Sequence, residues 1–287
     1  MKYRIFIFAL FITYLVGATT LMIWQGIGIA PDRYALVLLL GALLIRKTRS
    51  FLLDWLPFLF ILISYDFLRG FVPLINKNVH FTELIDAEKF IFGSIPTQTL
   101  QALYFQSGSL QWWDFLATIF YFLHFAQPLA FGYLLWMGNK EWFKKFVIAI
   151  SLVSYAAWAT FLVFPAAPPW MAARDGLLPS VTKILDQTLA SFPAAVELPT
   201  LYHNMNPNPV AAMPSMHGAY PFLVLLFAIK LFRWKGLLFL SYVAGVWISM
   251  VYLGEHYVID LLAGAIYALI FFFATDILFN KINRAKI

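Results

Sequence analysis

Long apolar runs follow one another along most of this chain, and they constrain its fold more than any other feature. Hydrophobic residues make up 62% of the 287 residues and charged residues 12%, whereas a soluble domain is typically about 25% charged. In lipid, every backbone polar group must find its partner within the protein, which helices provide. The sequence therefore predicts an all-α, polytopic bundle of membrane helices that forms one integral membrane domain over residues 1–287.

The apolar runs give about eight candidate transmembrane spans, with six as the alternative count. A bilayer needs about 20 residues for each crossing helix, so the short run at 33–45 is either tilted or re-entrant. The first run lacks a convincing small-residue cleavage site, which favours a retained helix over a signal peptide. The expected spans are Ile5–Trp24, Arg33–Ile45, Phe51–Ile75, Trp112–Trp136, Trp142–Phe164, Met216–Phe232, Gly236–Leu253 and Tyr257–Phe279.

The basic residues predict how the chain lies in the membrane. With eight spans, fourteen of the 20 lysines and arginines fall on one side, in clusters such as Arg46, Lys47 and Arg49. Positive charge marks the cytoplasmic side of a membrane protein. Both termini should therefore be cytoplasmic, and the loops that end at residues 215 and 256 should face the periplasm, the exterior or a lumen.

Two histidine motifs stand where apolar helices begin, on the same predicted side of the membrane. In Gly254-Glu-His-Tyr-Val-Ile-Asp260, the histidine and the aspartate are four residues apart and share one helix face. A carboxylate at this spacing accepts the proton of one imidazole nitrogen and leaves the other free to attack or to shuttle protons. His256 and Asp260 are therefore candidate catalytic residues.

The other motif, Pro214-Ser-Met-His217, combines a hydroxyl, an imidazole and unpaired backbone N–H groups at a helix start. Such helix starts bind phosphate. We therefore take His217 as a third catalytic candidate and Ser215 as a phosphate ligand. Gly218 and Tyr252 are further candidates for substrate binding. The alternative for the histidines and Asp260 is a polar contact that merely joins two helices.

A phosphate site also needs a cation, and the sequence leaves this role open. Arg174 is the only arginine between residues 165 and 214, and guanidinium groups bind phosphate oxygens in pairs. Its alternatives are an interfacial anchor or a partner for Asp175, and Lys183 is the second candidate cation. His124 lies inside a predicted span, where it either takes part in the chemistry or bonds a neighbouring helix.

The spacing of the spans divides the domain into three regions. Residues 1–75 are expected to form accessory spans, residues 76–111 an interfacial segment, and residues 112–279 the catalytic helix bundle. In the interfacial segment, apolar residues around Leu84 and Phe90 predict amphipathic helices at the membrane surface. These helices would either guide a lipid to the site or fill a gap in the bundle.

The two motifs resemble signatures of the type 2 phosphatidic acid phosphatase superfamily. Pro214-Ser-Met-His217 is similar to its second signature, and residues 254–264 are similar to its third. With Pro165-Ala-Ala-Pro-Pro169 and the stretch from Asp86 to Thr97, the chain looks most like the inositol phosphorylceramide synthase branch. The resemblance covers about residues 86–264.

This resemblance implies roles for the motif residues. His256 would form a phosphohistidine and Asp260 would orient it. His217 would protonate the leaving alkoxide, and Ser215 would bind phosphate. The chain departs from the family where Met250 follows Ser249 in place of an arginine, and the lysine-arginine signature of the hydrolases is not present as such. Two phosphate-binding cations are therefore missing or moved.

The predicted function is a membrane phosphotransferase that acts on lipid phosphate esters and needs no metal or cofactor. It would move a phosphoinositol-type head group from a phospholipid donor to a ceramide- or diacylglycerol-like alcohol. With water as the acceptor, the same site would be a lipid phosphatase acting on phosphatidic acid or a polyprenyl phosphate. The alternative class is a transporter or flippase, although the intramembrane acids lack the paired arrangement it would need. Nothing indicates nucleic acid, and the oligomeric state stays open.

Overall fold

The computed structural model describes residues 13, 17, 31–192 and 208–284, and this part of the chain is all helical apart from its turns and connections. Its only extended pairings are two isolated bridges, from Ala166 to His80 and to Ala211. The predicted all-α class is therefore confirmed for the described residues. The first predicted span, Ile5–Trp24, lies outside them except for Thr13 and Gly17.

The helices fall into long bundle helices and short helices within the connections. The long ones are α2 (Pro31–Leu44), α3 (Thr48–Arg69), α7 (Trp112–Gly138), α8 (Lys140–Val163), α12 (Met216–Phe232), α13 (Phe239–Tyr252) and α14 (Val258–Arg284). The short ones are α4 (Val72–Ile75), α5 (Thr82–Phe92), α6 (Pro96–Tyr104), α9 (Pro169–Arg174), α10 (Ile184–Ala190) and the 3₁₀ helix η2 (Arg233–Leu238). Each predicted span after the first coincides with one of these helices or with two in succession.

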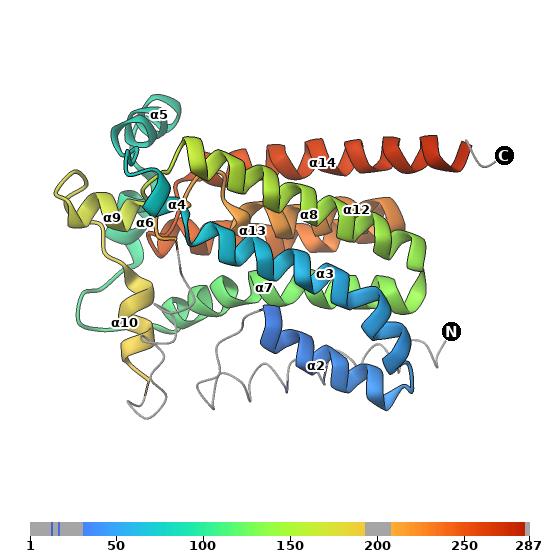
Figure 1. Cartoon of the computed structure of the whole chain (residues 1–287). Helices are drawn as coiled ribbons and strands as arrows, with labels where there is room; N and C mark the ends of the chain where they lie inside the picture. Colours follow the sequence, from blue (N-terminus) through green and yellow to red (C-terminus); the bar gives the residue numbers. More distant parts are fainter. Residues whose placement is uncertain (1–12, 14–16, 18–30, 193–207, 285–287) are drawn as a thin grey trace.

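Helix α12 stands at the centre of the bundle. It packs against α7, α8, α13 and α14, and its side chains Leu223 and Val224 are fully buried. Helix α3 packs on α8, and α2 packs on α3 and α7. Figure 1 shows α14, α8, α3 and α7 running alongside one another, with α2 on the outside. Buried Trp55 of α3 stacks with Phe51 and meets Phe143 of α8, which fastens the accessory helices to the bundle.

The outer faces of the long helices are apolar, as a hydrocarbon environment requires. Helix α3 exposes Leu53, Phe60 and Phe67, and α14 exposes Ile266 and Phe273. Exposed apolar surface on this scale marks contact with lipid or a partner in preference to water. The outer surface therefore supports the prediction of a membrane protein.

Helix lengths in the described part support fewer crossings than the predicted eight. Thr48–Ile75, Lys140–Val163 and Val258–Ile282 are long and apolar enough to span a bilayer. Trp112–His124 and Ala126–Gly138 form a fourth if these halves, bent by 46°, count as one span. Helices α2, α12 and α13 are shorter, with 14, 17 and 14 residues, so the number eight stays a prediction.

The short helices and the basic turns lie at opposite ends of the bundle. Figure 1 shows α5, α6, α9 and α10 gathered at one end, far from the C-terminus. At the other end, Lys145 and Lys230 both pair with Asp276, at 3.7 and 3.5 Å, which joins α8, α12 and α14. Lys140 pairs there with Asp54 at 2.7 Å. These ion-paired lysines therefore lie away from the short helices.

Backbone hydrogen bonds join four connections at the short-helix end. The N–H of His80 donates to the carbonyl of Pro165 at 2.8 Å, and the N–H of Ala166 donates to the carbonyl of Val210 at 2.8 Å. The N–H of Trp170 donates to the carbonyl of Gly254 at 3.0 Å. These bonds hold the connections together around the starts of α12 and α14, where the histidine motifs lie.

Two glycines let α12 and α14 approach closely at this end. A Cβ on Gly264 would lie 2.2 Å from the carbonyl oxygen of Ser215, and a Cβ on Gly218 would lie 2.9 Å from the Cα of Leu261. Both obstacles are backbone atoms, which cannot move aside as a flexible side chain does. Small residues allow such close helix crossings in membrane proteins.

Replacing Gly264 by alanine should push the two helix starts apart and destabilise the fold. We expect Gly264→Ala to lower the free energy of unfolding by about 1–3 kcal/mol, the usual cost of overpacking, seen as a lower Tm in detergent. Gly138→Ala is the matched control, since a Cβ at Gly138 of α7 meets nothing within 4 Å. Equal Tm values for Gly264→Ala and the wild type would contradict the close approach.

Candidate active site

Helix α12 begins at the first histidine motif. Ser215 is fully buried, and its Oγ accepts the N–H of Gly218 at 3.2 Å, as an N-cap serine does. The N–H of Ser215 donates to the carbonyl oxygen of Asp260 in α14 at 2.9 Å. Because His217 lies in the first turn after this cap, its place relative to α14 is fixed by both bonds.

A tight turn brings the second motif to the same place. Gly254 has a φ of 80°, a left-handed conformation that glycine adopts at little steric cost. His256 follows in the turn, and Asp260 lies in the first turn of α14. The carboxylate of Asp260 accepts the N–H of Tyr257 at 2.9 Å, which holds it against the helix start.

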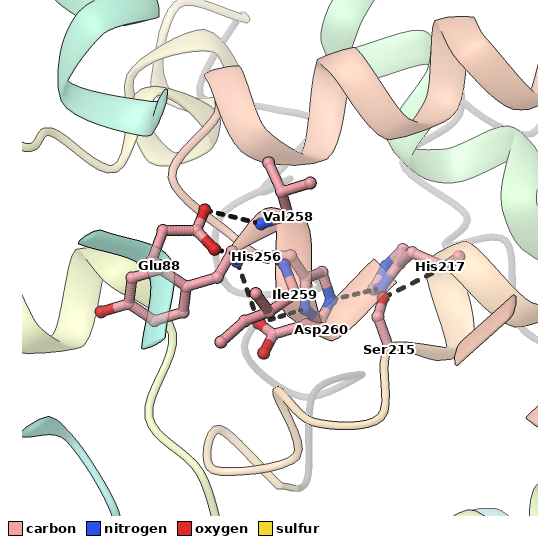
Figure 2. A network of polar contacts seen from close by, with 9 residues as sticks. Glu88, Ser215, His217, His256, Val258, Ile259 and Asp260 are labelled. Atoms are coloured by element: carbon pink, nitrogen blue, oxygen red, sulfur yellow. Dashed lines mark hydrogen bonds and ion pairs between the residues drawn. The ribbon is translucent and has the colours of Figure 1, made fainter. Parts of the chain in front are cut away.

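His256 stands between Asp260 and His217, as Figure 2 shows. Its Nδ1 lies 3.4 Å from Oδ2 of Asp260, and its Nε2 lies 2.9 Å from Nδ1 of His217. The first contact is long, as catalytic hydrogen bonds often are before substrate binds. Because the carboxylate attracts the proton of Nδ1, Nε2 keeps its lone pair and accepts the N–H of His217. The structure thus brings together the three residues predicted to be catalytic.

A third histidine lies against this pair. The ring centroid of His124 is 3.7 Å from that of His217, and the ring of Tyr121 is 4.7 Å from it. Nδ1 of His124 bonds to the carbonyl oxygen of Tyr121, one turn back in its own helix α7. His124 therefore reaches the site through its ring, which limits the orientations open to His217.

The predicted substrate ligands at the helix ends are engaged with protein partners in the described structure. The hydroxyl of Ser215 and the N–H of Gly218 bond each other. Tyr252, at the end of α13, donates its hydroxyl to the carboxylate of Asp114 in α7. A substrate phosphate would have to share or exchange these bonds, so the three assignments remain predictions.

Arg174 lies on the surface at the end of α9. It pairs with Asp175 at 2.7 Å, which is one of the alternatives that the sequence allowed. Lys183 pairs with Asp186 at 3.1 Å and lies 4.3 Å from the ring centroid of Trp170. Both cations therefore have local partners, and a role for either one in binding phosphate remains a prediction.

One arginine that the sequence offered only as a helix-surface partner of Asp66 lies near the histidines. Arg69 ends α3, and its side chain is 14% exposed. It donates to Asp66 at 2.8 Å, whereas its Nε is buried with no hydrogen-bond partner among the described residues. Its charge acts on both His124 and His217. The signal available in the sequence was an ionisable residue within the predicted span Phe51–Ile75.

Glu88 of α5 was also missed. It is fully buried, and its carboxylate accepts the N–H groups of Val258 and Ile259 at 2.9 and 3.2 Å. These amides open α14, directly between His256 and Asp260. Glu88 shares the buried face of α5 with Leu84 and Ile85. An acid on the apolar face of a predicted helix could have identified it from the sequence as a residue with a buried partner.

An apolar pocket of about 480 Å³ lies beside Tyr252, between α6, α7 and α13. It is lined by hydrophobic side chains, including Leu100, Trp113, Phe120 and Ile248. Apolar pockets of this size are typical of sites that take small ligands or lipid chains. Its wall thus continues from the outer surface of the bundle toward the end of α13, four residues before His256.

Paired histidines oriented by an aspartate, at the starts of two packed helices in an apolar bundle, define a phosphoryl-transfer enzyme of the membrane. Comparison with known proteins agrees with this class. A family model described as the PAP2 superfamily matches residues 82–274. This chain therefore belongs to the PAP2 superfamily, which confirms the resemblance to type 2 phosphatidic acid phosphatases.

Its similar relatives include synthases of inositol-containing sphingolipids. The chain is 31% identical over 232 residues to the phosphoinositol dihydroceramide synthase of Bacteroides thetaiotaomicron, covering 78% of this chain and 76% of that one. It is 26% identical over 241 residues to the inositol phosphorylceramide synthase of Candida albicans, covering 80% and 49% of the two chains. The catalytic subunit AUR1 of the Saccharomyces cerevisiae inositol phosphorylceramide synthase is 25% identical over 281 residues, covering 79% and 69%.

No solved structure matches the chain. The family and these relatives support the inositol phosphorylceramide synthase-like branch. The protein is accordingly a lipid phosphotransferase or phosphatase.

Removing the charge of Asp260 should abolish most of the activity while leaving the fold of the site intact. We expect Asp260→Asn to reduce kcat by on the order of 10³- to 10⁴-fold, because an amide favours the wrong tautomer of its histidine partner. Asp276→Asn is the matched control on the same helix, since Asp276 lies at the far end of α14 and pairs with Lys145 and Lys230. Turnover by Asp260→Asn within tenfold of the control would contradict the orienting role.

Proposed function

We propose that this protein transfers a phosphoinositol-type head group from a phospholipid to a ceramide- or diacylglycerol-like alcohol through a phosphohistidine on His256. The observation that carries the proposal is the chain of contacts from buried Asp260 through buried His256 to half-buried His217. The similarity to a phosphoinositol dihydroceramide synthase over about three quarters of both chains supports the head group and the acceptor class.

In the first step, Nε2 of His256 attacks the phosphorus of the donor lipid. A P–N bond forms, the bond from phosphorus to the diacylglycerol oxygen breaks, and protonated His217 gives a proton to that oxygen. Since Nδ1 of His217 lies 2.9 Å from Nε2 of His256 in the substrate-free site, the incoming phosphorus separates the two rings. Nucleophile and acid then face opposite sides of the reacting phosphorus.

In the second step, the hydroxyl of the acceptor attacks the phosphohistidine. His217, now neutral, takes the proton of that hydroxyl, the new P–O bond forms and the P–N bond breaks. Asp260 stabilises the positive charge that His256 carries while it is phosphorylated. The step balances without a metal or a cofactor. With water in place of the alcohol, and a phosphomonoester such as phosphatidic acid as the donor, the same steps would give a phosphatase.

Arg69 supplies the cation that the sequence left unassigned. Its buried Nε has no hydrogen-bond partner in the described part of the chain, and its charge acts on His124 and His217. A guanidinium in a site that excludes water stabilises phosphoryl oxygens strongly. The amides at the start of α12 add partial positive charge to the same region.

The outer surface of the bundle indicates where the lipid tails bind and which side of the membrane the site faces. The apolar pocket beside Tyr252 takes a hydrocarbon chain of the donor or the acceptor. Helix α5 exposes Phe90, Ile91 and Phe92, so it lies at the membrane surface. Because the basic turns lie at the opposite end of the bundle, we place the site on the extracytoplasmic face and both termini in the cytoplasm, with eight spans.

Turnover in micelles tests the reaction and its nucleophile together. With labelled phosphatidylinositol and ceramide, we expect the wild type to form the labelled inositol lipid and His256→Ala to lose this activity. His80→Ala is the matched control, since His80 lies at the same end of the bundle and bonds Glu83. Without acceptor, quenched wild-type protein should carry a phosphoinositol adduct on His256, detected by mass spectrometry.

Each other result of this experiment has a defined meaning. Release of phosphoinositol to water at the same rate with and without ceramide would assign the protein as a lipid hydrolase, and release of inorganic phosphate from phosphatidic acid would assign it as a phosphatase. Transfer that survives His256→Ala would refute the phosphohistidine. Failure of every phospholipid donor would refute the proposed transfer.

The phosphate role of Arg69 is tested by removing its charge. We expect Arg69→Gln to lower kcat/KM by on the order of 10²-fold or more, because a cation that meets developing charge is lost. Arg69→Lys keeps the charge without the fork and should retain part of the activity. Arg174→Gln gives the comparison with the other candidate, and a larger loss there than in Arg69→Gln would reverse the assignment.

A further inference from the structure

Glu88 reaches the catalytic helix from a distant part of the chain. Its two carboxylate oxygens accept the N–H groups of Val258 and Ile259, 170 and 171 positions further along. Figure 2 shows the carboxylate pointing at the first turn of α14, on the side of His256 away from His217. The side chain is fully buried, so this contact is shielded from water.

The partners of this carboxylate are backbone amides in place of a cation. Within the described residues, Glu88 forms no ion pair. The first amides of a helix have no acceptor inside the helix, and the 27-residue helix α14 adds the positive end of its dipole. Glu88 thus supplies from outside the acceptor that α14 lacks at its start.

The two amides that Glu88 binds lie in the turn that carries His256 and Asp260, so the contact bears on the geometry of the site. Val258 follows His256 by two residues, and Ile259 immediately precedes Asp260. Any shift of this turn changes both the 3.4 Å contact to Asp260 and the 2.9 Å contact to His217. In catalysis, displacements of about 1 Å can cost on the order of 10²-fold in rate.

We propose that Glu88 is a positioning residue of the reaction: its carboxylate holds the first turn of α14 so that His256 lies in line between Asp260 and His217. It touches neither the substrate nor the reacting atoms. The activity readout of this inference rests on the proposed function, whereas its structural readout does not.

The protonation of Glu88 gives the proposal a distinctive pH dependence. Burial raises the pKa of its carboxyl from 4.5 to about 7; Asp260 adds to the rise, and the two amide bonds oppose it. The other titratable group facing it is Tyr257. The ionised carboxylate accepts both N–H groups strongly, so the hold on α14 tightens as pH rises through 7.

The effect on stability has the opposite sign. Because the folded state binds the Glu88 proton more tightly than the unfolded state, the free energy of unfolding falls as pH rises from about 4.5 to about 7. Activity should therefore increase across the same range in which stability decreases. A residue with a purely structural role would move activity and stability in the same direction.

The first experiment needs no substrate. Hydrogen exchange in the peptide covering residues 254–262, measured at pH 8 on full-length protein in detergent, reports the hold on the first turn of α14. We expect Glu88→Gln to exchange faster there by on the order of tenfold, since an amide offers one good acceptor in place of two. The fall of Tm between pH 5 and pH 7.5 should shrink in this variant.

Glu83→Gln is the matched control. It makes the same chemical change on the same helix, but Glu83 is exposed and bonds His80. This bond holds the pKa of its carboxyl below the usual value, so Glu83 does not titrate near pH 7. Exchange and pH dependence should equal those of the wild type.

The second experiment measures head-group transfer between pH 5.5 and 9. We expect the wild-type kcat to rise through pH 7, and Glu88→Gln to lose this rise and to lie on the order of 10- to 100-fold lower at pH 8. The KM for both lipids should stay within about twofold. Glu88→Asp keeps the charge on a shorter side chain, and it should restore the pH dependence with a lower kcat.

The outcomes separate this inference from the proposed function. Unchanged exchange at residues 254–262 in Glu88→Gln would overturn the inference whatever the reaction is. A wild-type pH profile in that variant, or a change confined to KM, would overturn it as well. Faster exchange with no transfer by the wild type would refute the proposed function and leave the hold on α14 supported.

Discussion

The hydrogen bond from the Ser215 amide to the Asp260 carbonyl, with the close helix contact around it, is the constraint on which the site depends. It joins the starts of α12 and α14, the two helices that carry the histidines. Glycine at positions 218 and 264 removes the side chains that would keep these helices apart. His217 and His256 can therefore meet at 2.9 Å without help from a flexible loop. In hydrocarbon, where apolar burial does little to drive helices together, such close packing holds a bundle.

Much of the fold could be predicted because membrane helices leave a strong sequence pattern. The apolar runs placed the long helices to within a few residues, and the spacing of His256 and Asp260 identified a shared helix face. The span count could not be obtained in this way. Helix α13, with 14 residues, is short for a bilayer, and the apolar run that predicted this span begins in η2, the 3₁₀ helix that precedes α13.

The parts of the site that escaped prediction depend on tertiary contacts with no sequence spacing of their own. Glu88 binds backbone amides, which are not specific to any residue type, so no side-chain motif in the sequence identifies its partners. Arg69 belongs to α3, outside the residues that match the family model, and α3 reaches the site by packing on α8. Arg174 was predicted to bind phosphate because it is the one arginine of its loop, yet it pairs with its own neighbour, Asp175. Spacing predicts contacts along one helix far better than contacts between helices.

The joined connections at the short-helix end also bear on how the protein is made. Segments near residues 80, 166, 211 and 254 meet there, and the Glu88 bonds reach across 170 positions. During synthesis, a nascent chain that has inserted α12 but not α14 holds His217 without the contact to His256 and Asp260, the proposed nucleophile and its partner. Under the proposed mechanism, lipid chemistry would begin only once α14 has joined the bundle, and an incompletely inserted chain would leave the surrounding phospholipids unaltered.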